Sequence, residues 1–137
     1  MTAKEYLSQA FILDKRIQVK ERRLEWLKNH ASYVSNNLTE VVKASLSHRS
    51  AVEEAVVKIV DLEKELMNDI NKMIELKKEI AFMIRSVNNI ECETLLEMRY
   101  LTFMCWNDIM AHLNSSKDRV FRIHRKAINL INNSCNL

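Results

Sequence analysis

This chain of 137 residues contains no glycine and no proline. It therefore lacks any glycine-rich phosphate-binding loop and any turn set by the fixed backbone angle of proline. Because tight β-hairpin turns usually contain glycine, the sequence also has few patterns that would predict a β-hairpin. Leucine, lysine, glutamate, isoleucine and methionine are abundant, and most of these residue types favour helices. We expect an all-α protein whose length suits a modest core and not a large enzyme with a deep cleft.

Residues 51 to about 87 have apolar residues in unbroken steps of four and three. They are Ala55, Ile59, Leu62, Leu66, Ile70, Met73, Leu76, Ile80, Met83 and Val87. This spacing predicts a long helix with a heptad seam of the coiled-coil type. A seam of this length requires a partner. The partner is a first helix folded back antiparallel, a second copy of the chain, or both.

Residues 2 to about 29 supply that first helix, with apolar residues every three or four positions and an interruption at Lys20. Thr2 and Glu5 form a capping-box pattern at its start. Residues 30–50 are rich in serine and asparagine, so we expect a connector there, with room for a short helix over Leu38–Leu46. The resulting domain, residues 1–89, is a long antiparallel helical hairpin that dimerises. It ends at Asn88-Asn89, a pair that favours turns.

Residues 90–137 predict three further helices. Leu95, Met98 and Leu101 mark the first apolar stripe, and Trp106, Ile109 and Leu113 mark the second. Asn114-Ser115-Ser116 then breaks the pattern: asparagine tolerates a left-handed turn, and Ser115 or Ser116 is able to cap the next helix. The last helix has an inward face of Val120, Ile123, Ala127 and Leu130 or Ile131. This outline is a tri-helical helix-turn-helix unit.

The outward face of the last helix is basic. Between Ser115 and Leu137 there are five Lys or Arg residues against one acid, Asp118, although the formal net charge of the chain is only +3. Recognition helices have this character, because their first turns read base edges while nearby cations neutralise phosphates. The candidate DNA-binding residues comprise Ser116, the base-contact candidates Lys117, Asp118 and Arg122, and the phosphate-contact candidates Arg119, Arg125 and Lys126. We expect His124 to be packed, and Phe121 either to pack or to touch a thymine methyl group.

A family resemblance is found at the same residues. The run from Leu95 to Ile128, above all LLEMRYL, Trp106, Ile109 and the block Val120-Phe121-Arg122-Ile123-His124, resembles the C-terminal part of small phage and prophage proteins of Gram-positive bacteria. Those proteins are related to ArpU-type late transcriptional regulators, and their C-terminal segment is similar to region four of sigma factors. The opening MTAKEYLSQA and the central KIVDLEKELMNDINKMIELKKEI also resemble that family.

The resemblance implies a regulator of phage transcription that reads duplex DNA with the helix containing Lys117 to Lys126. Host RNA polymerase is a second implied partner, as it is for sigma-type domains. Two positions depart from the family pattern. Asn114-Ser115-Ser116 stands where the family has Gly-Tyr-Ser, and Arg125 stands where a small residue follows the histidine.

Other functional classes have weaker support. The four histidines accompany no nucleophile motif and no HExxH pattern, so we expect no enzyme and no cofactor. Cys92, Cys105 and Cys135 are odd in number and lack CxxC spacing, which predicts neither a disulfide framework nor a zinc site. No apolar run approaches 18 residues, so we expect no membrane association and a cytoplasmic location. The family resemblance implies that this is the cytoplasm of the bacterial host cell. The main alternative is a non-catalytic coiled-coil adaptor whose basic helix is simply solvated.

Overall fold

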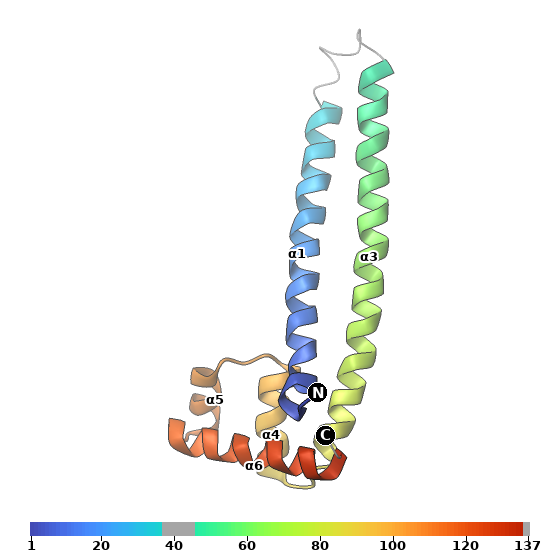
Figure 1. Cartoon of the computed structure of the whole chain (residues 1–137). Coiled ribbons are helices and arrows are strands. Elements are labelled where there is room, and N and C mark those ends of the chain that lie inside the picture. Colours follow the sequence, from blue (N-terminus) through green and yellow to red (C-terminus); the bar gives the residue numbers. More distant parts are fainter. Residues whose placement is uncertain (37–45, 136–137) are drawn as a thin grey trace. The chain divides into compact units, whose positions relative to one another are not determined.

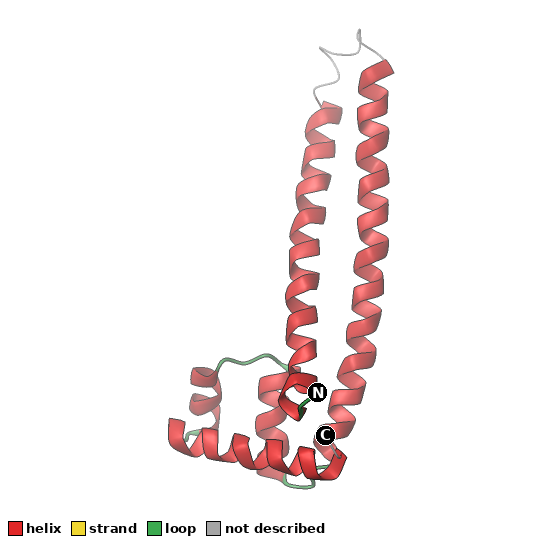
Figure 2. Ribbon diagram, viewed as in Figure 1, coloured by secondary structure: helices red, strands yellow, loops and turns green. Residues whose placement is uncertain are grey.

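The computed structural model describes residues 1–36 and 46–135, and it confirms an all-α protein (Figure 1). The elements in chain order are α1 (Ala3–Asn36), α3 (Leu46–Arg85), α4 (Ile90–Leu96), the π-helical η2 (Glu97–Leu101), α5 (Trp106–Leu113) and α6 (Lys117–Cys135). The described residues form helices, the turns and loops that connect them, and two residues before α1, with no strand among them (Figure 2). No helix in this described part is long and apolar enough to cross a membrane.

The chain forms two compact units. The C-terminal unit comprises Met1–Asp14 together with Lys72–Leu137, and the hairpin unit comprises Lys15–Asn71. These units differ from the division at residue 89 that the sequence suggests, because the first turns of α1 and the end of α3 belong with the C-terminal helices.

Both long helices extend further than the sequence predicts. α1 continues to Asn36 and α3 begins at Leu46, so a connector over residues 30–50 is wrong for residues 30–36 and 46–50. Residues 37–45, which hold nearly all of the short helix expected over Leu38–Leu46, lie outside the described residues. Serine and asparagine cost a helix only about 0.7 kcal/mol or less per residue, and no glycine or proline stops it here.

In the hairpin unit, α1 and α3 run antiparallel with a polar pair in their interface. Lys20 Nζ lies 2.6 Å from Asp69 Oδ2, and both side chains are buried. Arg16 Nε also lies 3.3 Å from Asp69 Oδ2, and Lys28 pairs with Glu63 at 3.4 Å. Asp69 follows the buried residues Ala55 and Leu62 at seven-residue intervals, so it takes the seam position predicted for Ile70, which is only half-buried. Lys20, which interrupts the apolar pattern of α1, is therefore one member of a buried ion pair.

In the C-terminal unit, the start of α1 completes the core. The predicted capping box is confirmed, because Thr2 N donates to Glu5 at 2.8 Å and Glu5 N donates to the Thr2 hydroxyl at 3.2 Å. Ala3, Leu7 and Ala10 then follow as fully buried residues. Ala3 N donates to Asn132 Oδ1 of α6 at 3.3 Å, which ties the first turn of the chain to its last helix.

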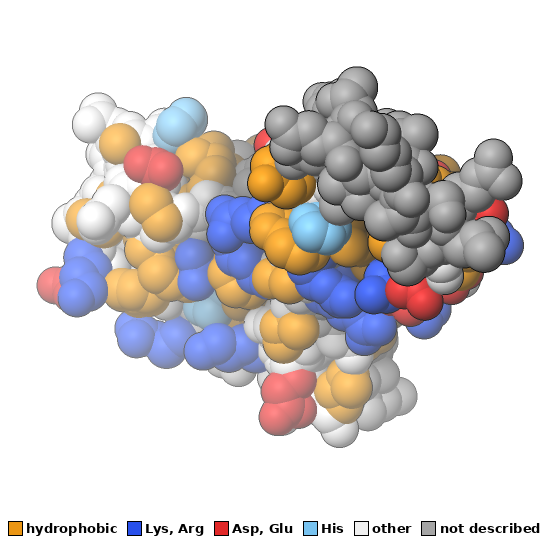
Figure 3. All heavy atoms as spheres, turned by 90° about the horizontal axis from the view of Figure 1, so that it is seen from above, with side chains coloured by type: hydrophobic (Ala, Val, Ile, Leu, Met, Phe, Trp, Pro, Cys, Tyr) orange, Lys and Arg blue, Asp and Glu red, His pale blue; other side chains and the backbone are white. Residues whose placement is uncertain are grey.

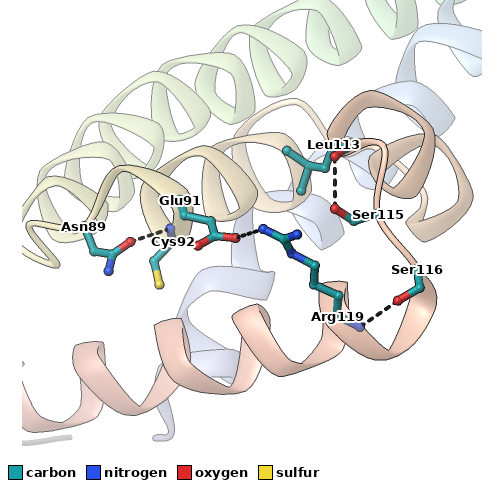
Figure 4. A network of polar contacts seen from close by, with 7 residues as sticks. All are labelled: Asn89, Glu91, Cys92, Leu113, Ser115, Ser116 and Arg119. Carbon is teal, nitrogen blue, oxygen red and sulfur yellow. Dashed lines mark hydrogen bonds and ion pairs between the residues drawn. The ribbon is translucent and has the colours of Figure 1, made fainter.

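Asn88 and Asn89 separate α3 from α4, as predicted. Asn88 has a left-handed backbone with φ 54°. The side chain of Asn89 caps α4 by accepting from Cys92 N at 3.1 Å (Figure 4). α4 packs against α6 and α5 packs against both η2 and α6, so the recognition-helix candidate lies in a small helical assembly.

Candidate nucleic-acid interface

The turn between α5 and α6 has the predicted geometry. Asn114 ends α5 in the left-handed conformation, with φ 48° and ψ 46°. Its N–H donates to Ala111 O at 3.2 Å, and the N–H of Ser115 donates to Met110 O at 3.1 Å. Asparagine replaces glycine here at low steric cost. The chain therefore passes from α5 to α6 within three residues without glycine.

Each serine of the turn has a distinct role (Figure 4). The Ser116 hydroxyl accepts from Arg119 N at 3.3 Å, which makes Ser116 the cap of α6. The Ser115 hydroxyl instead donates to Leu113 O at 3.0 Å and so closes the end of α5. The sequence allowed either serine to cap α6, and the structure selects Ser116.

All seven candidate DNA-binding residues are exposed on one surface. They are Ser116, Lys117, Asp118, Arg119, Arg122, Arg125 and Lys126. The opposite side of α6 is buried through Val120, Ile123, Ala127 and Ile131, as predicted. Seen from above, the molecule has Lys and Arg side chains next to one another among apolar side chains on other parts of its surface as well (Figure 3). The structure thus brings these seven residues together, with the polar face of α6 turned to solvent.

Within residues 1–36 and 46–135, Arg119 differs from the other cations of α6 because it has an acidic partner. Its Nη2 lies 3.1 Å from Glu91 Oε1 at the start of α4, and the two side chains are 57% and 51% exposed (Figure 4). A phosphate that binds Arg119 must compete with this carboxylate. The two residues are 28 positions apart and no periodicity links them, so sequence reasoning missed Glu91.

His124 and Phe121 serve the core of the unit. The ring of half-buried Phe121 lies 4.8 Å from that of Trp106, and the Trp106 ring also meets His124 edge-on at 4.9 Å. His124 is 8% exposed, and its Nε2 lies 2.7 Å from the Tyr100 hydroxyl oxygen. The packed position expected for His124 is confirmed.

Burial also sets the protonation of this pair. It is the largest cause that lowers the pKa of His124 to about 4, and the charges of Lys4 and Arg99 lower it further. Burial raises the pKa of Tyr100 to about 12, despite an opposing effect of Arg99. Both side chains are neutral near pH 7. His124 therefore adds no charge to the basic surface of α6.

The segment before α5 holds a second feature that the sequence did not indicate. Arg99 in η2 donates from Nη1 to Met104 O at 2.9 Å, and its guanidinium carbon lies 4.5 Å from the centre of the Trp106 ring. Phe103 has φ 58°, which is unfavourable for a bulky residue. Its ring packs edge-on against Phe11 at 5.9 Å, and Lys77 Nζ lies 4.8 Å from its centre. These contacts fix the start of α5.

The cysteines and acids offer no metal centre in the described part of the chain, where no cluster of three or more His, Cys, Asp or Glu side chains has suitable geometry. Cys92 is buried and free, and burial raises its thiol pKa. Cys105 is exposed and free. Glu63 and Glu65, which are two residues apart, form ion pairs with Lys28 and Lys20 respectively.

Comparison with known proteins identifies a family but no function. No curated protein matches the chain, and no solved structure does. Residues 33–132, more than two thirds of the chain, match a family described as "Protein of unknown function (DUF1492)". The match extends from the end of α1 through most of α6, and so includes the whole turn between α5 and α6. The chain belongs to the DUF1492 family.

Proposed function

We propose that the protein is a phage or prophage transcriptional regulator that binds duplex DNA as a homodimer through the helix-turn-helix of α5 and α6. The observation that carries this proposal is the exposed cationic face of α6. It begins directly after a left-handed turn, and its opposite face is buried. In helix-turn-helix proteins this is the element that enters the major groove.

Residues of α6 divide into two roles in this proposal. Lys117, Asp118 and Arg122 lie on its first turns and contact base edges. Arg125 and Lys126 lie further along, contact phosphates and carry no sequence information directly. Arg119 reaches a phosphate only by leaving Glu91. Host RNA polymerase is the proposed protein partner once the regulator is on its operator.

A coiled-coil adaptor that binds protein partners is the second candidate. The observation that favours it is the number of large apolar side chains exposed in the hairpin unit, among them Trp26 at 63% and Tyr33 at 67%. An adaptor uses such a surface and leaves the cations of α6 solvated. The two candidates differ in whether α6 binds DNA.

A DNA pull-down separates these candidates. Fragmented phage and host DNA is incubated with the purified protein, and the bound DNA is sequenced. An Arg122→Ala/Lys117→Ala double variant is run beside it, after circular dichroism shows that it is folded. A Lys64→Ala variant changes an exposed cation of α3 and serves as the control. Enrichment of one site by the wild type and the control alone supports the regulator. No enrichment by any of them supports the adaptor.

Single substitutions then separate base contacts from phosphate contacts. We expect Arg122→Ala to remove about 1–3 kcal/mol of discrimination between the operator and a scrambled duplex, because a base contact is lost. Arg125→Ala should weaken binding to both duplexes alike and reduce the slope of log K against log salt by about one. Fluorescence anisotropy over a salt series measures both effects. Equal losses of discrimination in the two variants would contradict the division of roles.

A further inference from the structure

α1 has a row of exposed apolar side chains in the hairpin unit. Val19, Trp26 and Tyr33 follow one another at intervals of seven residues and are 56%, 63% and 67% exposed. A strict seven-residue repeat keeps side chains aligned with another helix, as in a coiled-coil seam. The buried seam of α1, which faces α3, contains Ile17 and Lys20 and is a different set of residues. We call the row Val19, Trp26 and Tyr33 the outer ridge.

A groove of about 490 Å³ lies beside the outer ridge, between α1 and α3. Its lining residues are Arg23, Trp26 and Leu27 of α1 and Lys58, Asp61, Leu62 and Glu65 of α3. Leu27 and Leu62 form its floor, since they are less exposed than the charged residues around them. The Trp26 ring stacks on His30 at 5.1 Å with an angle of 4° between the planes, which holds a flat aromatic surface at the rim.

Charge disfavours a parallel symmetric contact between the outer ridges of two copies. Helical geometry places Arg22 on one side of the ridge and Arg23 on the other. With the two ridges parallel and related by a two-fold axis, Arg22 of each copy would lie against Arg23 of the partner subunit. Such like-charge contacts are destabilising. A partner surface that presents acids complements this ridge.

The same face of the hairpin unit supplies those acids from α3. Asp61 and Glu65 line the groove opposite Arg23, and Glu54 lies two turns before Asp61 on the same side of the helix. Lys58 is the cation among them. All four side chains are exposed. One face of one hairpin therefore combines a basic, aromatic half from α1 with a mainly acidic half from α3.

We propose that a second copy of the chain covers this face, with α1 of each copy lying against α3 of the other. A two-fold axis parallel to the helices places each outer ridge over the partner's groove at the same height. Arg23 of each copy then meets Asp61 and Glu65 of the partner subunit, and the two hairpins form a four-helix bundle. An interface of this kind is self-complementary, as two-fold symmetry requires. The proposal specifies the interface of the homodimer in the proposed function, and it is tested without DNA.

Two exposed apolar residues of α3 lie away from the groove. Val60 and Met67 are 41% and 56% exposed, and neither lines the groove. Met67 is two residues from Glu65, so it lies on nearly the opposite side of α3. A change at Met67 is therefore a matched control for a change at Trp26.

Sedimentation equilibrium of the full-length protein over a dilution series tests this interface. The wild type is expected to be a dimer that weakens as salt is raised. Trp26→Ala should raise the dimer Kd by roughly tenfold or more, as loss of an interface aromatic does. Arg23→Glu and Asp61→Lys should each dissociate it as well. Met67→Glu should leave the Kd unchanged, and circular dichroism checks that every variant is helical.

Mixing the two charge variants is the decisive step. In a mixed dimer, Glu at position 23 of one copy meets Lys at position 61 of the other, and the second contact keeps the native Arg23 and Asp61. An equimolar mixture of Arg23→Glu and Asp61→Lys should therefore recover the dimer that each variant alone has lost. A monomeric wild type, a mixture that stays monomeric, or a dimer lost in Met67→Glu but kept in Trp26→Ala overturns the proposal. DNA binding that fails while the dimer persists overturns only the proposed function.

Discussion

His124 connects the packing of the C-terminal unit to pH. Its ring is buried between Tyr100 and Trp106, and its pKa is lowered from 6.5 to about 4. Between those values the unfolded chain binds a proton that the folded chain does not. Stability therefore rises with pH through this window. The contribution of His124 is complete above about pH 6.5 and is lost as pH falls towards 4, up to about 3 kcal/mol in all.

We expect His124→Gln to flatten this dependence, because glutamine does not titrate and still offers Tyr100 a hydrogen-bond partner. The free energy of unfolding in urea is measured at about pH 7 and about pH 5 for both proteins. The wild type should lose more stability on acidification than the variant, by an amount approaching 1.4 kcal/mol per pH unit. His30→Gln, a change at an exposed histidine of α1, is the control. Parallel losses in His124→Gln and the wild type would show that His124 does not titrate in this window.

The sequence predicts that His124 is buried, but it does not predict that Tyr100 is its hydrogen-bond partner. His124 follows Ile123 on the buried side of α6, so its packed position is predictable from helical spacing alone. Its partner Tyr100 is 24 residues away, in another helix. The ion pair of Glu91 with Arg119 is equally distant in sequence. Periodicity determines which face of a helix is buried, whereas the partner across an interface depends on how two helices cross.

Among the helices, the buried pair of Lys20 and Asp69 decides which residues of α1 and α3 lie opposite one another. A slip of one heptad would leave two buried charges without their partners. Asp69→Leu leaves Lys20 with only Glu65 at 3.7 Å among the ion pairs seen here, and we expect it to cost about 3–5 kcal/mol. Lys20→Met/Asp69→Leu removes both charges and should be far less destabilising than either single change. Urea denaturation measures all three variants.

An exposed ion pair provides the control for this test. Glu75 and Lys78 lie 3.2 Å apart with side chains about 70% exposed, so Glu75→Gln should change stability by less than about 1 kcal/mol. A double variant at positions 20 and 69 as unstable as Asp69→Leu would contradict a coupled pair. The heptad seam of α3 was predicted from the sequence, but with Ile70 at the position that Asp69 occupies. An aspartate is a poor guess for a buried seam position unless its lysine partner on the other helix is known.

At the scale of the whole molecule, the two ends of the chain share one core. Ala3, Leu7 and Ala10 of α1 are fully buried in the same compact unit as α6, and Ala3 bonds to Asn132. The sequence instead described residues 90–137 as a helix-turn-helix unit of their own. The apolar stripe of α6 is as predicted. The first predicted stripe is only partly correct, because Leu95 is buried with Cys92, Leu96 and Tyr100, whereas Met98 and Leu101 are half-buried. Periodicity marks the apolar face of a helix but does not show that the start of α1 packs in the same unit.

This shared core predicts that a change near the N-terminus weakens DNA binding at the other end of the chain. Leu7→Ala removes a side chain with 0% exposure and should destabilise the C-terminal unit by about 2–5 kcal/mol. In a Trp26→Phe background, Trp106 is the remaining tryptophan, so its fluorescence follows the unfolding of this unit. Ile12→Ala, at a position 67% exposed on the same helix, should leave the urea midpoint unchanged.

If α6 reads DNA, Leu7→Ala should also lower operator affinity at temperatures where Trp106 reports partial unfolding, and affinity should recover on cooling. A Trp106 transition that is the same in Leu7→Ala and in the background protein would mean that the C-terminal helices fold without α1. The separate unit predicted from the sequence would then be correct.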